Sequence, residues 1–360
     1  MAVEFHKLKV ADVRRETPDA VSIAFAVPPE LKDEYRFSPG QHLTLRRDCD
    51  GEDVRRSYSI CNGLDDGELR VAVKKVEGGL FSTLCNEAIR QGDTIDVMTP
   101  QGRFGVMPES GKARNYLAVA AGSGITPILS LLRSILTREP DSRFVLIYGN
   151  RNSKSIIFKE ALEDLKDRFL GRLTVHHVLS REQQEIDLFN GRVDASKIET
   201  LLRSFTPAKE IDHAFLCGPG AMIEEARRVL TKLGTPESHI HIEYFSSDGA
   251  PVTPRRVALG ATASEEMPVA QARITLHGSA YEFPMLDGET VIDAGERAGL
   301  EMPYSCRGGM CCTCRGKLVS GEVEMAVNYS LEPWEQEAGY VLTCQSRPLS
   351  KEIVIDYDEV

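Results

Sequence analysis

Four cysteines in the last quarter of the chain constrain its fold more than any other feature. They are Cys306, Cys311, Cys314 and Cys344. Their spacing, C-x4-C-x2-C followed by a distant fourth cysteine, is that of plant-type [2Fe–2S] ligation. Gly308 and Gly309 lie between the first two thiols, and without side chains they let the backbone curl and turn N–H groups toward sulfur. The spacing therefore predicts a one-electron iron–sulfur carrier.

Structural zinc and a disulfide framework are the alternatives for these thiols. Zinc ribbons usually present two C-x2-C pairs, whereas here one such pair exists and the fourth cysteine stands alone. Nine cysteines in a 360-residue chain whose first residues, MAVEFHKLKV, lack a signal-peptide core point to a reducing compartment. We therefore favour iron–sulfur in a cytoplasmic protein without a transmembrane helix. Cys312, inside the loop, is expected to be a packing residue and not a ligand, and a ligand swap with a neighbouring thiol is the alternative.

The charge of the chain is negative and unevenly distributed. The net charge is −11, and residues 271–360 hold 7 Lys/Arg against 15 Asp/Glu, a net charge of −8. Nucleic-acid binding is disfavoured, because phosphate contacts need the opposite sign. An acidic carrier domain suits docking on a basic partner surface, although simple solubility explains the charge nearly as well.

Residues 1–110 have the pattern of an antiparallel β-barrel. Short runs such as HKLKVADV, AVSIAFAV and LRVAVKKV are separated by turn dipeptides, among them Pro39-Gly40 and Asp66-Gly67. One helix-like stretch, Phe81 to Arg90, interrupts them. Many short strands with regular turn signals favour a small closed barrel.

Residues 113–245 alternate apolar strands with helical stretches, here expected at Ile125 to Arg138, Phe158 to Arg168 and Ala221 to Leu233. This alternation predicts a doubly wound α/β domain with a parallel sheet. Residues 246–270 are rich in Gly, Pro, Ser and Ala and are expected to form a linker. Residues 271–360 contain a hairpin-like pair, a helix from Val291 to Ala298, the cysteine loop and closing strands, which indicate a small α+β domain.

A glycine turn follows the first strand of the α/β segment. The sequence runs NYLAVAA and then Gly122-Ser123-Gly124-Ile125-Thr126-Pro127 before a helix. Glycines at this point let a pyrophosphate approach the backbone and the helix N-terminus. After the second strand, Arg151, Ser153 and Lys154 would favour a 2′-phosphate and hence NADPH. A solvated basic turn is the alternative interpretation of these residues.

The barrel segment carries a second candidate nucleotide site. Arg56-Ser57-Tyr58-Ser59 offers a guanidinium for phosphate, an aromatic ring and a hydroxyl for a flavin, although an ordinary strand could carry the same residues. Gly79, with Ser82 three residues later, opens a helix and provides a further phosphate seat. Two candidate phosphate-binding sites favour FAD, which has two phosphate groups, over FMN, which has one.

The combined motifs resemble the ferredoxin–NADP reductase superfamily. R-x-Y-S, the G-x-x-S helix start, GSGITP, Cys217-Gly218-Pro219 and Glu243-Tyr244-Phe245 occur in that family's order, and a C-terminal ferredoxin domain resembles oxygenase reductases. The resemblance implies a FAD-binding barrel (1–110), a NADP-binding α/β domain (113–245), a linker (246–270) and a β-grasp [2Fe–2S] domain (271–360).

The resemblance also implies roles for individual residues. Ser59 would lie near the flavin N5, Cys217 beside the nicotinamide, Glu243 near the reacting rings and Phe245 over the flavin face. Core filling by Cys217 and a plain surface charge at Glu243 are the alternatives. Further FAD contacts would come from Arg56, Tyr58, Val73, Lys74 and Ser82, and contacts to the NADPH pyrophosphate and ribose from Gly122, Gly124, Thr126 and Pro127. Gly79, Gly218, Arg151 and Ser153 are further candidate cofactor contacts.

The implied activity is electron transfer from NADPH through FAD and a [2Fe–2S] cluster to a separate oxygenase. The partner would be the oxygenase component of a multicomponent complex, which acts either on an aromatic coenzyme A thioester or by aromatic-ring hydroxylation. A redox sensor that binds flavin and cluster without turnover is a third hypothesis. The full set of hydride-site residues argues against it.

Overall fold

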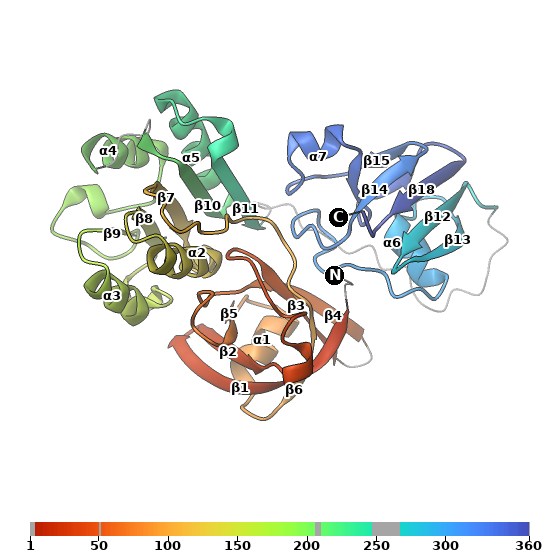
Figure 1. Ribbon diagram of the computed structural model, residues 1–360, viewed down its shortest axis with the longest axis horizontal. Coiled ribbons are helices and arrows are strands. Elements are labelled where there is room, and N and C mark those ends of the chain that lie inside the picture. The colour runs from red at the N-terminus through yellow and green to blue at the C-terminus, as the bar shows by residue number, and fades with distance from the viewer. Residues whose placement is uncertain (1–3, 50–51, 206–209, 247–266, 360) are drawn as a thin grey trace. The chain divides into compact units, whose positions relative to one another are not determined.

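The computed structural model describes residues 4–49, 52–205, 210–246 and 267–359 (Figure 1). The chain divides into two compact units, a larger one from Phe5 to Gly249 and a smaller one that contains the segment from Ala250 onward. Most of the predicted linker, 246–270, lies outside the described residues. Among the described residues, no helix has the length and apolar character needed to cross a bilayer.

The N-terminal part of the larger unit is the antiparallel barrel that the turn pattern predicted. Its sheet has the order β4-β3-β6-β1-β2-β5, and a bridge between Ile60 and Val71 joins the two ends of that order. Alternating side chains such as Leu8 and Val10 fill the interior, while Lys7 and Lys9 face outward. The strands are β1 (Phe5–Thr17), β2 (Ala20–Ala26), β3 (His42–Cys49), β4 (Glu52–Ser59), β5 (Leu69–Lys74) and β6 (Thr94–Met98).

Helix α1 (Leu80–Glu87) packs on this barrel and is shorter than the predicted stretch that reached Arg90. Phe81 and Cys85 on α1 are buried in the barrel core. Beyond the helix, the Arg90 amide binds the Asp93 carboxylate at 2.8 Å, so the chain turns instead of continuing the helix.

The second part of the larger unit is a parallel five-stranded sheet of order β11-β10-β7-β8-β9. In this order the first strand, β7, lies beside the fourth, β10, and ligands of open α/β sheets bind where such a reversal occurs, at the carboxyl ends of the strands. The strands are β7 (Asn115–Ala121), β8 (Arg143–Asn150), β9 (Leu173–Leu179), β10 (His213–Pro219) and β11 (Ile240–Ser246).

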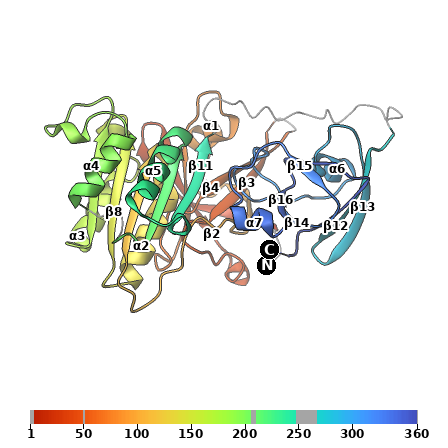
Figure 2. The same ribbon diagram turned by 90° about the horizontal axis from the view of Figure 1, so that it is seen from above.

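Helices cover both faces of this sheet (Figures 1 and 2). Helices α2 (Ile125–Arg138) and α3 (Lys159–Arg168) pack on the face that also meets the barrel, whereas α4 (Ala195–Phe205) and α5 (Gly220–Leu233) pack on the other. Helix α4 was not predicted. Its signal was present, because Ile198, Leu201 and Leu202 repeat at helical spacing and are buried.

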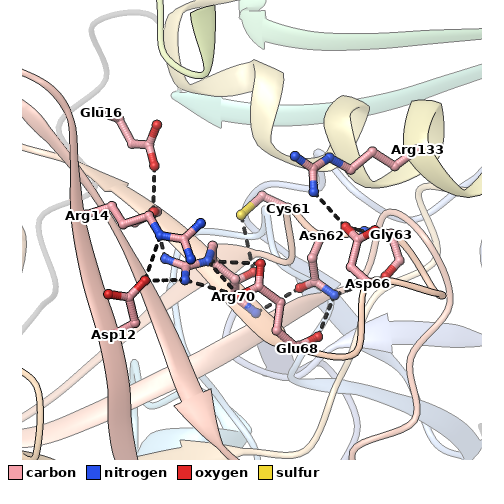
Figure 3. A network of polar contacts seen from close by, with 11 residues as sticks. Asp12, Arg14, Glu16, Cys61, Asn62, Gly63, Asp66, Glu68, Arg70 and Arg133 are labelled. Atoms are coloured by element: carbon pink, nitrogen blue, oxygen red, sulfur yellow. Dashed lines mark hydrogen bonds and ion pairs between the residues drawn. The ribbon is translucent and has the colours of Figure 1, made fainter. Parts of the chain in front are cut away.

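Buried and half-buried polar contacts join α2 to the barrel. The Ser130 hydroxyl donates to the Asn62 carbonyl at 2.7 Å. Arg133 pairs with Asp66 at 2.6 Å (Figure 3). Nearby, the buried Arg70 guanidinium binds carboxylates of Asp12 and Glu68 at 2.6 and 3.1 Å. Because α2 begins at the glycine turn, these contacts fix that turn relative to the barrel.

The smaller unit is a mixed sheet of order β13-β12-β18-β14-β16 with a helix packed against it. The first and last strands of this unit, β12 and β18, pair in parallel, which is the arrangement expected of a β-grasp domain. Its elements are β12 (Ala270–Leu276), β13 (Ser279–Met285), α6 (Val291–Arg297), β14 (Arg315–Ser320), β15 (Val323–Met325), α7 (Pro333–Glu337), β16 (Tyr340–Leu342), β17 (Ser346–Pro348) and β18 (Glu352–Asp356).

Candidate flavin, nicotinamide and iron–sulfur sites

Three of the four predicted catalytic side chains meet at one carboxylate. Ser59, buried at the end of β4, donates its hydroxyl to Glu243 Oε2 at 3.3 Å, although 184 residues separate the two. Cys217 and Glu243 are register partners in β10 and β11, with 4.0 Å between Sγ and Oε2. Burial, followed by the nearby Glu243 carboxylate, raises the pKa of the Cys217 thiol well above its usual value. The thiol is therefore neutral at physiological pH.

The structure agrees with core filling as one role of Cys217 but not with a plain surface charge at Glu243. Cys217 is fully buried in the core, so it fills space and also borders the carboxylate. Glu243 is half-buried and engaged with Ser59, which makes it more than a surface charge. Phe245, the fourth predicted catalytic residue, packs half-buried on the same apolar core as Cys217. Its predicted position over a flavin remains a prediction.

The predicted glycine turn sits at the reversal point of the sheet. Gly122 adopts a φ of +55°, and Gly124 lies so close to β10 that a Cβ there would stand 2.2 Å from the Cys217 carbonyl oxygen. Gly218 also has positive φ, and a Cβ there would meet Met222 Cε at 2.9 Å. Glycine is thus required at Gly124 for the close packing of the turn against β10, as at the glycine turns of dinucleotide-binding sheets.

Other predicted contacts surround this turn. Lys74, at the end of β5, was predicted as a flavin contact, but its Nζ lies 3.8 Å from where a Gly122 Cβ would lie, and it pairs loosely with Asp19 at 3.8 Å. Thr126 is buried and donates to the Ser123 carbonyl at 3.0 Å, and Pro127 occupies the first turn of α2. The Lys74 cation therefore lies beside the turn where the coenzyme diphosphate was predicted.

The predicted flavin residues lie on β4, β5 and α1. Arg56 is exposed, and within the described chain its guanidinium hydrogen-bonds only a carbonyl, that of Arg55, at 2.7 Å. The Tyr58 ring lies 6.1 Å from that of Phe81, between centroids, and burial raises the pKa of its hydroxyl. Buried Val73 uses its carbonyl to accept from Asn86 at 3.1 Å.

Gly79 and Ser82 shape the start of α1. The Ser82 hydroxyl donates to the Gly79 carbonyl at 3.2 Å and accepts from the Val76 amide at 3.0 Å, so it closes the turn. A Cβ on Gly79 would stand 2.6 Å from that hydroxyl. The Arg56 guanidinium, which has no carboxylate partner among the described residues, forms with a neighbouring aromatic ring and a tight helix start a set of groups that fits a flavin nucleotide.

The predicted adenosine end of the coenzyme site contains residues that the sequence analysis missed. Arg151 is exposed, but the amide and hydroxyl of Ser153 both bind Glu182, which follows β9, at 2.8 and 2.9 Å. Arg181 lies beside Arg151, because its amide donates to the Arg151 carbonyl at 2.7 Å. Arg181 and Glu182 lie outside the strand–turn–helix unit whose motif predicted Arg151 and Ser153, so the spacing within that motif could not reveal them. The sequence Ser-Arg-Glu directly after a buried strand was the available signal.

The four predicted cluster ligands form two pairs in the smaller unit. The side chains of Cys306 and Cys311 contact each other, as do those of Cys314 and Cys344. Four thiolates about 2.3 Å from one zinc would all lie within about 4 Å of one another. Among the described residues, these thiols do not form a set of three or more ligand atoms within 4.8 Å of one another. Two pairs suit a two-iron centre better than a single ion.

Backbone amides around these sulfurs favour thiolates. The Gly308 and Met310 amides lie 3.3 and 3.4 Å from Cys306 Sγ, and the Cys306 amide lies 3.5 Å from Cys311 Sγ. Cys312, with φ of +54°, instead turns its thiol to the Ser330 carbonyl at 3.4 Å. The donor set fits a [2Fe–2S] cluster, and Cys312 has a contact of its own that supports its prediction as a packing residue.

Three family models match successive parts of the chain. An oxidoreductase FAD-binding domain matches residues 7–105, an oxidoreductase NAD-binding domain matches 118–228, and a 2Fe-2S iron–sulfur cluster binding domain matches 274–349. The third match contains all four predicted ligands. The cofactors of this chain are therefore FAD, NAD(P)H and a [2Fe–2S] cluster.

Relatives share this arrangement over nearly their whole length. The chain is 47% identical to one of the subunits of the 1,2-phenylacetyl-CoA epoxidase of Escherichia coli, covering 98% of each chain. It is 34% identical to the ferredoxin reductase component of a Rhodococcus rhodochrous 3-ketosteroid-9-alpha-monooxygenase, covering 97% of this chain and 96% of that one. Phthalate dioxygenase reductase has the same fold, with a TM-score of 0.59 and 24% identity over 98% of both chains.

The order of the folded parts, the converging site residues and these matches agree with one another. The chain belongs to the ferredoxin–NADP reductase superfamily and is an NAD(P)H-dependent flavin and iron–sulfur oxidoreductase of the kind that serves as the reductase component of oxygenases.

Proposed function

We propose that this protein is the NADPH-dependent reductase of a phenylacetyl-CoA epoxidase. The meeting of Ser59, Cys217 and Glu243 carries the redox part of this proposal, because it brings the flavin barrel and the nicotinamide sheet to one point. The choice of partner rests on the 47% identity to the Escherichia coli epoxidase component, which exceeds the 34% identity to the ketosteroid monooxygenase reductase.

In this proposal the larger unit holds two nucleotides against each other. Arg56 and the start of α1 would hold the FAD phosphates, and the Gly122 turn with Lys74 would hold the coenzyme diphosphate. Ser59 would present its hydroxyl to the flavin edge while Glu243 fixes that hydroxyl's direction at 3.3 Å. The neutral, fully buried Cys217 adds no charge beside the nicotinamide.

The cofactors supply hydride and single-electron transfer when bound, and the protein supplies position and environment. Cys306, Cys311, Cys314 and Cys344 would hold the cluster, with the Gly308 and Met310 amides stabilising thiolate charge. Arg151 and Lys154 would favour the 2′-phosphate of NADPH, and their lack of described ion pairs supports that role. The acidic ferredoxin segment would suit a basic docking surface on the oxygenase.

Reconstitution tests the proposal. Purified reductase, NADPH and the oxygenase subunits of a phenylacetyl-CoA epoxidase should form the epoxide from phenylacetyl-CoA, with NADPH oxidation coupled to product. A parallel assay would use the oxygenase component of an aromatic-ring hydroxylase. Coupling only in the parallel assay would reject the epoxidase partner and leave the reductase assignment intact. A non-turnover sensor would show no sustained NADPH oxidation with ferricyanide.

A further inference from the structure

A carboxylate occupies the donors on which the predicted 2′-phosphate seat depends. Glu182 Oε2 accepts from both the amide and the hydroxyl of Ser153, at 2.8 and 2.9 Å. These two hydrogen bonds, with smaller contributions from Lys159 and Lys154, lower the pKa of Glu182 below its usual value. The side chain is therefore an anion at neutral pH, held where another anion was expected.

Basic residues lie on the segments around this carboxylate. The pairing of β8 with β9 continues past the last register pair, Asn150 and Leu179, because the Ser180 amide donates to the Asn150 carbonyl and the Arg181 amide to that of Arg151. Arg151 and Arg181 thus lie side by side at the carboxyl edge. Both are exposed, and neither has an ion pair within the described chain. The Ser153 donors, with Lys159 and Lys154 acting on the same carboxylate, make an anion site that Glu182 occupies from within the protein.

We propose that Glu182 is a coenzyme-selectivity residue that competes with the 2′-phosphate of NADPH for the Ser153 amide and hydroxyl. NADPH must displace this carboxylate, since two anions cannot share the same donors without repulsion. NADH carries a 2′-hydroxyl at that position, which can donate to the carboxylate and leave it in place. The reductase should then discriminate between the two coenzymes less strongly than Arg151, Arg181 and Lys154 alone would dictate.

The proposal rests on the proposed function in one respect, the placement of the coenzyme's adenosine end at Arg151 and Ser153. Glu182→Gln tests it, because the amide keeps the shape of the side chain and removes the charge. The ratio of kcat/KM for NADPH to kcat/KM for NADH, measured with ferricyanide, should rise about tenfold. The Kd of 2′,5′-ADP, which carries the 2′-phosphate, should fall by a similar factor, while that of 5′-AMP should change little.

Glu185→Gln is the matched control, since Glu185 is exposed on the same segment and has no described contact with Ser153. Equal shifts in both variants would mean that overall charge alone acts, which would overturn the competition. An unchanged or lower coenzyme ratio in Glu182→Gln would overturn it as well.

Arg151→Ala separates this failure from failure of the proposed function. If that variant weakens 2′,5′-ADP binding but Glu182→Gln does nothing, the seat is correct and the competitor is wrong. If Arg151→Ala leaves 2′,5′-ADP binding unchanged, the placement of the adenosine end is wrong and the competition falls with it.

Discussion

The larger and the smaller unit prepare for their cofactors in different ways. In the larger unit the site residues come from distant parts of the chain, as when Ser59 meets Glu243 across 184 residues. In the smaller unit three of the four thiols lie within nine consecutive residues, 306–314, and the fourth closes the set. A nucleotide site here depends on how a barrel and a sheet pack, whereas the cluster site depends mainly on one loop.

The two regions also differ in what faces the ligand. Around the thiols, amides of the loop itself, such as those of Gly308 and Met310, approach sulfur. Around the glycine turn, Gly124 packs closely against Cys217, and the cation Lys74 comes from the barrel. Changes in the loop should therefore abolish one electron carrier cleanly. Changes at the packed junction should affect binding, reaction rate and stability together.

Removing one predicted ligand gives the largest expected effect. Cys311→Ser should lose the cluster, because a hydroxyl is a poor iron ligand, and cytochrome c reduction should fall at least about 100-fold. NADPH–ferricyanide activity should persist, since the flavin and nicotinamide sites lie in the other unit. Visible absorption and both activities would be measured in the same preparation.

The neighbouring thiol provides the control for this prediction. Cys312→Ser changes the same atom one residue away, where Sγ contacts the Ser330 carbonyl and not another predicted ligand. It should keep the cluster absorption and both activities. Loss of the cluster in Cys312→Ser with its retention in Cys311→Ser would mean that the ligand set is wrong.

A methyl group at the packed junction should disturb several properties at once. In Gly124→Ala the new Cβ would stand 2.2 Å from the Cys217 carbonyl oxygen, so β7 and β10 must separate. We expect a loss of about 2–4 kcal/mol in unfolding free energy and roughly a tenfold slower flavin reduction by NADPH. Denaturation followed by flavin fluorescence and stopped-flow absorbance would measure the two effects.

Gly122→Ala is the comparison within the same turn. There the nearest atom to a new Cβ is Lys74 Nζ at 3.8 Å, so the penalty comes from the φ of +55° and should be about 1–2 kcal/mol. If the two variants lose equal stability, close packing is not what selects glycine at Gly124.

The contrast between local and distant construction also explains what the sequence could predict. Spacing identified the cysteine loop, and strand–helix alternation identified the parallel sheet and the boundaries of α2. The same reasoning placed Ser59 and Glu243 as separate candidates but could not show that one carboxylate serves both Ser59 and Cys217. Periodicity and motif order record what neighbours do along the chain, whereas a shared carboxylate is created by packing.

Two features of the structure were not predicted from the sequence, and their reasons differ. Glu182 and Arg181 lie beside the predicted coenzyme residues Ser153 and Arg151 only because β9 lies beside β8, which no motif in either segment states. The missed helix α4 is a different case, since Ile198, Leu201 and Leu202 gave a helical pattern that the sequence analysis overlooked. Contacts between neighbouring strands depend on the order of the strands in the sheet, whereas the spacing of apolar residues along the chain is sufficient to indicate a helix such as α4.

At the amino end of the same sheet, a group of histidines should make the larger unit sensitive to acid. His213 and His241 share a hydrogen bond of 3.1 Å, and His241 stacks on Phe215 with 4.9 Å between centroids. Burial, with His213 and His239 adding to it, lowers the pKa of His241 from 6.5 to about 4. Because the folded pKa lies below the unfolded one, the unfolded chain binds the proton more readily. The contribution of neutral His241 to the unfolding free energy is therefore present above pH 6.5 and is lost as the pH falls toward 4.

His241→Phe should keep the stacking and remove this titration. Between pH 7 and pH 4.5 the unfolding free energy of the unmodified protein should fall by about 2 kcal/mol more than that of the variant. Urea denaturation at several pH values, followed by far-UV circular dichroism and by flavin fluorescence, would show it. His277→Asn, at an exposed position of the smaller unit, should leave the flavin transition unchanged at every pH. Identical pH profiles of unfolding free energy for His241→Phe and the unmodified protein would mean that His241 does not cause the acid sensitivity.

The smallest expected effect lies at the exposed rim of the junction between barrel and sheet. Arg138 Nε and Nη2 bind the two Asp65 carboxylate oxygens at 2.9 and 2.8 Å, but the side chains are 39% and 48% exposed. Water and ions screen such a pair, so Arg138→Ala should lower the unfolding free energy by only about 0.5 kcal/mol, less at 1 M salt. Ser130→Ala, which would leave the Asn62 carbonyl without its buried hydroxyl donor, should lose about 1–2 kcal/mol at any salt concentration. A larger and salt-sensitive loss in Arg138→Ala would mean that charge, and not buried hydrogen bonding, holds the barrel to α2.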